Sequence, residues 1–191
     1  MKLPEHEKHL WPQDPTTYQQ KHWTMTQSHL THFRTAVDCG AHVGIFTLRM
    51  AELFQHVIAI EPTTPELVVA NTGHLTNVEV LPIGVSDKKT TLYRYNPGST
   101  TACTELHSEP NDSPVEVMPI DLLGIADVDL IKIDTQGLEK NVIQGAEQTI
   151  RQYTPTIHIE TRDQDLIAWI CQQFNYQVKG RVIKDWCLQK A

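Results

Sequence analysis

The chain has 191 residues, of which 40% are hydrophobic and 20% are charged, so it is long enough for one globular domain with an ordinary core. Sixteen Lys and Arg residues against twenty-three Asp and Glu residues give a formal charge of -7, which argues against nucleic acid as a partner. No run of about 18 apolar residues is present, so we expect no membrane span. The four cysteines lie far apart in the sequence, which favours a reducing compartment and a cytoplasmic location.

Residues 1–33 form a histidine-rich arm with few aliphatic side chains. Asp14 is placed to cap a helix that begins at Pro15, and we expect this helix to run toward His32. The spacing of the histidines does not indicate a metal site. The arm could pack on the domain, contact a second copy of the chain, or cover a substrate as a lid.

From residue 35 onward, short apolar runs alternate with helical segments of about ten residues. This alternation predicts an α/β fold of the Rossmann-like, doubly wound type, whose seven-stranded sheet is mostly parallel with an antiparallel C-terminal strand. The expected strands are 35–38, 56–60, 78–81, 128–134 and 156–160, followed by a pair at 176–180 and 183–188. The expected helices are 44–54, 65–73, 138–152 and 164–174. In such folds the ligand lies at the carboxyl ends of the strands.

Residues 82–119 interrupt this alternation. Residues 83–86 and 90–95 are typical of a hairpin, and residues 96–114 are rich in Pro, Ser, Thr and acidic side chains. We therefore expect a long loop over 96–114. Functional loops and loops without fixed structure share this composition, so the sequence leaves both roles open.

The most informative segment is a strand that ends at Asp38 and a turn that contains Gly40 and Gly44 before the next helix. In the dinucleotide-binding fingerprint, the second glycine would stand where this chain has His42, and a bulky side chain there argues against NAD. The carboxylate of Asp38 would repel a pyrophosphate. It suits a cation, such as the sulfonium and ammonium groups of S-adenosylmethionine.

A second carboxylate, Glu61, follows the strand at 56–60. Its two oxygens could accept charge-assisted hydrogen bonds from ribose hydroxyls. A strand-end Glu is often only solvated, and glycines at a strand-to-helix junction are often only turn residues. The combination at this spacing nevertheless predicts a nucleoside cofactor.

Three blocks of sequence resemble the class I S-adenosylmethionine-dependent methyltransferases and, more narrowly, the FkbM family. They are residues 37–48, residues 58–62, and residues 129–139 with 142–146 behind them. The third block is similar to the lysine-isoleucine-aspartate strand and glycine-glutamate turn of the family. Weaker likenesses are found at 84–87, 99–101 and 155–160. The family commonly has Glu where this chain has Gln136, so no role is carried over to that side chain.

The resemblance implies that residues 34–191 form a methyltransferase domain with S-adenosylmethionine as its cofactor. It also implies O-methylation of a hydroxyl on a sugar or another small-molecule, natural-product acceptor. The cofactor contacts that it implies come from Asp38, Gly40, Ala41, His42, Gly44 and Glu61, with Ser86 or Asp87 near the adenine.

Methyl transfer to a hydroxyl requires alignment and a proton acceptor, so the candidate catalytic residues lie at strand ends. Asp134 and Glu160 are the first candidates. His158 is the reserve, because strand alternation puts it on the same face as Glu160. Asp134 could instead cap the next helix, and His158 could bond a backbone carbonyl. With Glu139, the three could also bind a divalent cation, although the spacing does not require one.

Two other functions remain open at this point. A non-catalytic, partner-binding domain could retain the same fold, and a nicotinamide-dependent oxidoreductase would share its first strand and helix. The signature of enzymes that methylate amino groups, an Asp or Asn followed by two prolines and an aromatic residue, is absent, since Thr135, Gln136 and Gly137 follow Asp134. Exocyclic base nitrogens are therefore disfavoured as acceptors, which again argues against nucleic acid.

Overall fold

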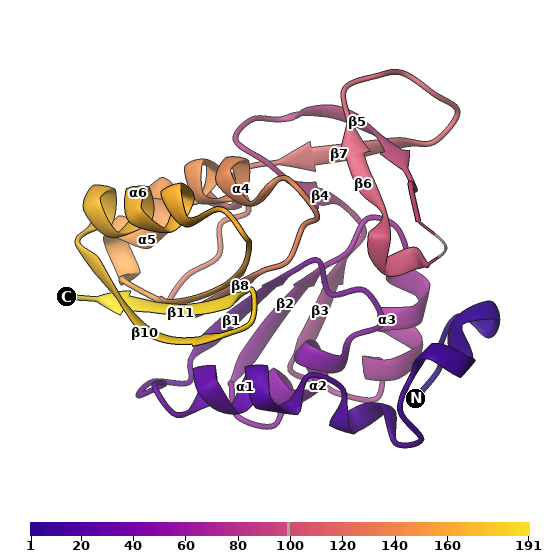
Figure 1. Ribbon diagram of the computed structural model, residues 1–191, viewed down its shortest axis with the longest axis horizontal. Coiled ribbons are helices and arrows are strands. Elements are labelled where there is room, and N and C mark those ends of the chain that lie inside the picture. Colours follow the sequence, from indigo (N-terminus) through magenta and orange to yellow (C-terminus); the bar gives the residue numbers. More distant parts are fainter. Residues whose placement is uncertain (99) are drawn as a thin grey trace.

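Seven strands form the central sheet of the computed structural model, which describes residues 1–98 and 100–191 (Figure 1). Their order is β10-β11-β9-β8-β1-β2-β3. Neighbouring strands from β9 to β3 pair in parallel, and β11 pairs antiparallel with both β9 and β10. The predicted mostly parallel sheet with an antiparallel C-terminal strand is therefore confirmed. The strands are β1 (Thr35–Cys39), β2 (His56–Ile60), β3 (Val78–Leu81), β8 (Val128–Ile133), β9 (Thr156–Glu160), β10 (Tyr176–Val182) and β11 (Asp185–Lys190).

Helices cover both faces of this sheet, as Figure 1 shows. Because both faces are covered, β1 and β9 are buried along their whole length, including the polar side chains of Asp38 and His158. One face carries α1 (Gln20–Gln27), α2 (Ile45–Ala51) and α3 (Pro65–Thr72), and the other carries α4 (Glu139–Gly145), α5 (Glu147–Tyr153) and α6 (Gln164–Phe174). None of the helices among the described residues has the length and apolar character that a membrane crossing requires.

The helix predicted over 138–152 is divided at Ala146, between α4 and α5. The division follows from close packing of Gly145 against the carbonyl oxygen of Ser86. A Cβ atom at position 145 would lie 2.0 Å from that oxygen. The helix is therefore divided next to the position where the backbone of Ser86 packs against Gly145.

A second sheet of four strands stands beside β3, in the order β4-β7-β5-β6. It corrects two expectations. The predicted hairpin strands do not pair with each other, because β7 lies between them, parallel to β4 and antiparallel to β5. The region 96–114 also is not one loop, since it contains the 3-10 helix η3 and strand β6; Ser99 within it lies outside the described residues. The elements are β4 (Gly84–Val85), β5 (Thr90–Tyr95), η3 (Thr101–Cys103), β6 (Glu105–His107), β7 (Pro114–Met118) and, after them, η4 (Ile120–Leu122).

The arm contains two short 3-10 helices, η1 (Glu5–Leu10) and η2 (Pro15–Thr17), ahead of α1. Asp14 caps η2 as expected, accepting the N–H of Thr16 at 3.0 Å. The predicted continuous helix is wrong, however, because Gln19 has a φ of 51° and α1 begins only after it. The bend turns Tyr18 and Gln19 toward the carboxyl edge of the central sheet, where both line a cavity.

Helix α1 is held against β9 and β11 by contacts between residues far apart in the sequence. The ring of Trp23 is 4% exposed and packs on Phe46. The hydroxyl of Thr26 lies 2.6 Å from Nδ1 of His158. This half of the arm thus contributes side chains to the hydrophobic core.

Candidate active site

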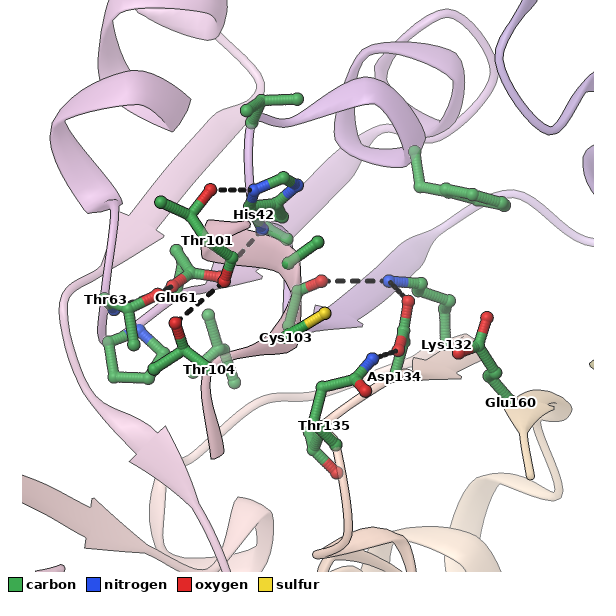
Figure 2. Close-up of a pocket in the computed structure, with 18 of the residues that line it drawn as sticks. His42, Glu61, Thr63, Thr101, Cys103, Thr104, Lys132, Asp134, Thr135 and Glu160 are labelled. Carbon is green, nitrogen blue, oxygen red and sulfur yellow. Dashed lines mark hydrogen bonds and ion pairs between the residues drawn. The ribbon is translucent and has the colours of Figure 1, made fainter. Parts of the chain in front are cut away.

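A cavity of about 360 Å³ opens at the carboxyl ends of β1, β2, β8 and β9 (Figure 2). Its walls come from two different parts of the chain. We call the strand-end residues the floor: Gly40, Ala41, His42, Glu61, Lys132, Asp134 and Glu160. We call the residues of the arm and of the segment around η3 the cover: Trp11, Tyr18, Gln19, Thr100, Thr101, Ala102, Cys103 and Thr104.

The turn after β1 must begin with glycine. Gly40 has a φ of 79°, and a Cβ atom there would lie 1.9 Å from the carbonyl oxygen of Asp134. The N–H groups of Gly40 and Ala41 both donate to the carbonyl of Ile60, at 3.0 and 3.2 Å. The turn is therefore fixed between β2 and β8 and brings bare backbone to the cavity.

His42 adopts a left-handed conformation with a φ of 54°. Its N–H donates to Oε2 of Glu61 at 2.7 Å, and its Nε2 lies 2.7 Å from Oγ1 of Thr101. The ring stacks on Trp11, with 5.9 Å between ring centroids. Burial lowers the pKa of His42 below its ordinary value, so the ring is neutral at pH 7. This side chain joins the floor to the cover.

Glu61 is 4% exposed, and its two carboxylate oxygens accept different numbers of hydrogen bonds. Oε1 accepts the N–H and hydroxyl of Thr63, at 2.7 and 2.6 Å, and the N–H of Thr64 at 3.1 Å. Among the described residues, Oε2 accepts the N–H of His42. Each carboxylate oxygen offers about two lone-pair sites, so Oε2 retains capacity for one further donor.

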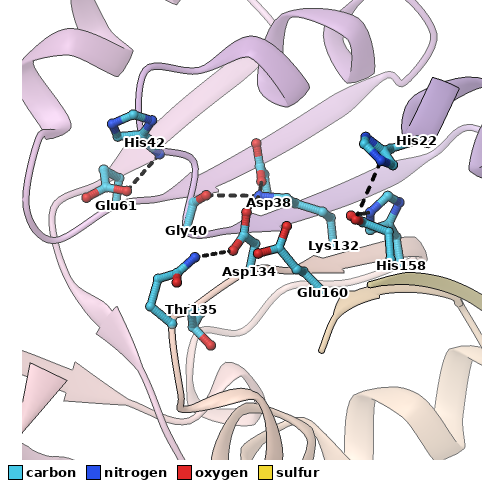
Figure 3. A network of polar contacts seen from close by, with 12 residues as sticks. His22, Asp38, Gly40, His42, Glu61, Lys132, Asp134, Thr135, His158 and Glu160 are labelled. Carbon is cyan, nitrogen blue, oxygen red and sulfur yellow. Dashed lines mark hydrogen bonds and ion pairs between the residues drawn. The ribbon is translucent and has the colours of Figure 1, made fainter. Parts of the chain in front are cut away.

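Lys132 of the floor is at the centre of a charged network (Figure 3). Its Nζ donates to the carbonyl of Gly40 at 2.9 Å and lies 3.2 Å from Oδ1 of Asp38 and 3.6 Å from Oδ2 of Asp134. Burial alone would lower the pKa of Lys132, but the two carboxylates outweigh it and hold the pKa above its ordinary value. The lysine is therefore charged, and it ties the turn after β1 to the end of β8.

The opposite end of the cavity holds a second pair of charges. Glu160 is 8% exposed and its Oε1 accepts a hydrogen bond from Nζ of Lys184, in the turn between β10 and β11. Burial raises the pKa of Glu160, and the nearby Asp134 carboxylate raises it further. Tyr18 reaches this end from the cover, and burial, followed by the charges of Asp134 and Glu160, raises the pKa of its phenol.

Six of the eleven residues predicted for the site line the cavity: Gly40, Ala41, His42, Glu61, Asp134 and Glu160. The other five do not. Asp38 is fully buried below the floor, where its Oδ2 accepts the hydroxyl of Thr47 at 2.7 Å. Gly44 faces α3. Ser86 and Asp87 lie beside α4, where Asp87 accepts Nδ2 of Asn141 at 3.0 Å.

His158, the fifth of these residues, lies on β9 two residues before Glu160 and is 1% exposed. Its Nε2 is 2.9 Å from Oδ1 of Asp185, and its Nδ1 contacts Thr26 of the arm. Both ring nitrogens are therefore engaged with α1 and β11. The alternation of β9 is as expected, but only the strand-end member of the pair reaches the cavity.

The sequence reasoning did not assign a role to Lys132, Lys184, Trp11, Tyr18 or Thr101. A signal existed for Lys132, because it is a charged residue between the buried Ile131 and Ile133, close to the end of β8. Tyr18 and Thr101 belong to segments whose packing depends on distant residues, so no local pattern marks them.

The carboxylates considered for a metal do not converge. Oε1 of Glu139 accepts the N–H of Gly137 at 2.9 Å, and His158 is turned away from the cavity. Within residues 1–98 and 100–191, no group of three or more His, Cys, Asp and Glu side chains is arranged to hold a metal ion.

Comparison with known families decides what kind of domain this is. The model of the methyltransferase FkbM domain matches residues 38–178. The chain belongs to the FkbM methyltransferase domain family. A sequence comparison with the curated proteins found no match.

Solved structures share the fold of this FkbM domain. Methyltransferase FkbM from Methylobacillus flagellatus KT is 21% identical with a TM-score of 0.61, over 96% of this chain and 49% of that one. Precorrin-6y C5,15-methyltransferase from Geobacter metallireducens GS-15 is 11% identical with a TM-score of 0.56, over 95% and 93%. The ribosomal protein L11 methylase from Lactobacillus delbrueckii subsp. bulgaricus is 10% identical with a TM-score of 0.56, over 93% and 80%. The FkbM domain described here therefore spans about half of the length of its Methylobacillus relative.

Proposed function

We propose that this FkbM domain is an S-adenosylmethionine-dependent methyltransferase that acts on a hydroxyl group of a sugar or another small natural-product acceptor. The observation that carries the proposal is the division of one cavity into two ends. The glycine turn and Glu61 stand at one end, and the carboxylates of Asp134 and Glu160 stand at the other. Family membership supports the methyl transfer, and the negative net charge argues against a nucleic acid acceptor.

The residues of the first end fit a nucleoside cofactor. Gly40 allows the turn to pack closely against the carbonyl of Asp134, and it lines the cavity with backbone alone. Oε2 of Glu61 has capacity for a ribose hydroxyl, and a hydrogen bond to a carboxylate is stronger than one between neutral groups. Asp38 would act through Lys132, by fixing the turn, because it does not reach the cavity.

S-adenosylmethionine supplies a methyl group on a sulfonium, an electrophile that requires no nucleophile from the protein. The chain must then accept the proton of the acceptor hydroxyl. Glu160 fits this role because burial raises its pKa toward neutrality, which makes its carboxylate a stronger base than an exposed one. Lys184 would remain beside it as a counter-charge, and Asp134 could orient the hydroxyl from β8.

The assignment is tested by titrating the protein with S-adenosylmethionine in a calorimeter and by thermal melting. At 100 times the dissociation constant the cofactor stabilises the native state by about 2.7 kcal/mol. Glu61→Gln should raise the dissociation constant at least tenfold, because the amide of the glutamine has a donor in place of one carboxylate oxygen and carries no charge to attract the ribose hydroxyl. Glu79→Gln, an exposed carboxylate on the adjacent β3, is the matched control and should leave it unchanged.

Three results would reject the assignment. Equal cofactor affinity of Glu61→Gln and wild type would remove the ribose role. Binding of NAD, with no heat from S-adenosylmethionine, would favour the oxidoreductase instead, and binding of neither would favour a non-catalytic, partner-binding domain.

A further inference from the structure

Glu7 is a buried carboxylate in the arm, although it belongs to a short helix at the surface. It is 2% exposed, and it accepts a hydrogen bond from the N–H of Thr101, a residue 94 positions away. A carboxylate buried to this extent is costly unless it is hydrogen-bonded. The contact therefore fixes η1 and η3 relative to each other.

Thr101 makes a second contact that reaches the floor (Figure 2). Its Oγ1 lies 2.7 Å from Nε2 of His42, whose N–H donates in turn to Glu61. One residue thus connects the arm, the η3 segment and the carboxylate assigned to the ribose. The chain of contacts runs Glu7, Thr101, His42, Glu61.

The arm is also held on the C-terminal side of Glu7. The ring of Trp11 stacks on His42 and lies 4.8 Å from the ring of Tyr18. Nη2 of Arg49 donates to the carbonyls of Thr16 and Tyr18, at 2.6 and 2.5 Å. Arg49 is 8% exposed, so this anchor is itself buried in the domain. The arm is therefore bound to the domain between Glu7 and its bend at Gln19.

We propose that Glu7 and Thr101 are positioning residues that clamp the arm and the η3 segment together over the Glu61 end of the cavity. The inference rests on the proposed function, because it assigns that end to the cofactor. The clamp closes the path above His42, and the cofactor leaves when the contact between Glu7 and Thr101 opens. The clamp consequently sets how long the cofactor stays bound, while the floor sets which molecule is bound.

The test measures association and dissociation rates of S-adenosylhomocysteine, the demethylated cofactor, by stopped-flow tryptophan fluorescence. Glu7→Met removes the acceptor of the Thr101 N–H, and Thr101→Val keeps that N–H but removes the hydroxyl that contacts His42; both change the side-chain volume little. Each should raise the dissociation rate about tenfold and change the association rate less than threefold. Glu7→Gln and Thr101→Ser each restore an acceptor or a hydroxyl and should return the rate toward wild type. Glu5→Met, on the exposed side of the same η1 helix, is the matched control and should have no effect.

Hydrogen exchange of the wild type supplies a second measurement that requires no variant. Amides of residues 5–11 and 100–104 should both exchange more slowly when S-adenosylhomocysteine is bound. Dissociation rates equal to wild type in both Glu7→Met and Thr101→Val would overturn the clamp, and so would unchanged exchange in these segments. Failure of the wild type to bind S-adenosylhomocysteine would instead overturn the proposed function, and the clamp with it.

Discussion

The floor and the cover of the cavity are built by different kinds of interaction. The floor is fixed by backbone hydrogen bonds between parallel strands and by the ion network of Lys132, Asp38 and Asp134, most of it fully buried. The cover is held by isolated contacts of side chains between segments that are 31 to 94 residues apart, such as Arg49 with Tyr18 and Glu7 with Thr101. One wall therefore moves only if the sheet moves, whereas the other can be released one contact at a time.

Typical magnitudes show how unequal the two walls are. Breaking a buried ion pair by removing one partner costs about 3–5 kcal/mol. A single hydrogen bond contributes about 0.5–1.5 kcal/mol, or about 1.5–3 kcal/mol when one partner is charged. A cavity with one rigid and one releasable wall can admit a ligand without disturbing the groups that act on it.

The largest expected effect is on the floor, at Gly40. Gly40→Ala should cost more than about 5 kcal/mol of unfolding free energy or prevent folding, because its Cβ would meet the carbonyl of Asp134 at 1.9 Å. Gly124→Ala is the matched control. Gly124 also has a positive φ, of 67°, but no atom of the described residues lies within 4 Å of its added Cβ, so only about 1 kcal/mol should be lost. Urea denaturation measures the unfolding free energy of both variants. Equal losses would show that glycine is required at position 40 for its backbone conformation and not for its close approach to Asp134.

Lys132→Met should have the next largest effect. It leaves the buried Asp38 without its cation and should cost about 3–5 kcal/mol of unfolding free energy. Lys89→Met, which removes an exposed pair with Glu116, should cost less than about 1 kcal/mol. If the two variants lose the same free energy in urea denaturation, the network does not hold the floor.

Glu160→Gln should change the stability least of these variants, and the sign of the change follows from the pKa of Glu160. Because burial raises its pKa, the folded protein binds the Glu160 proton more tightly than the unfolded chain does. The stability from this proton is complete below the ordinary pKa of about 4.5 and is lost as the pH rises through the folded value. Glu160→Gln should therefore unfold at a higher temperature than wild type at pH 7, with a smaller difference at pH 4.

Turnover should respond in the opposite direction to stability. The base must be ionised, so methyl transfer by the wild type should fall as the pH drops through the Glu160 pKa. Glu160→Gln should lower the rate of methyl transfer about 10²–10⁴-fold and remove this acid limb, with cofactor affinity nearly unchanged. A variant that is less stable at pH 7 and fully active would contradict both parts.

Local patterns were sufficient to predict the floor apart from Lys132, but not the cover. Apolar runs place the strands, and parallel topology then brings Glu61, Asp134 and Glu160 to one edge of the sheet. The bend at Gln19 interrupts a segment with a helix cap at its start, and it is held by Arg49, which lies beyond any local pattern. The second sheet was missed for a similar reason. Val115 and Val117 alternate as in a strand, yet their partners β4 and β5 are separated from them by the η3 segment.

The packing of α1 against strands that are translated much later has a consequence for folding during biosynthesis. Thr26 meets His158, 132 residues later, and the carbonyl of His29 accepts Nε2 of Gln189 at 2.5 Å, 160 residues later. A ribosome makes the helix long before it makes the strands on which the helix rests, and contacts of such separation form slowly. Helix α1 is thus translated early and is among the last elements to dock, and a nascent chain stopped before β11 would lack the Gln189 contact to the residues after α1.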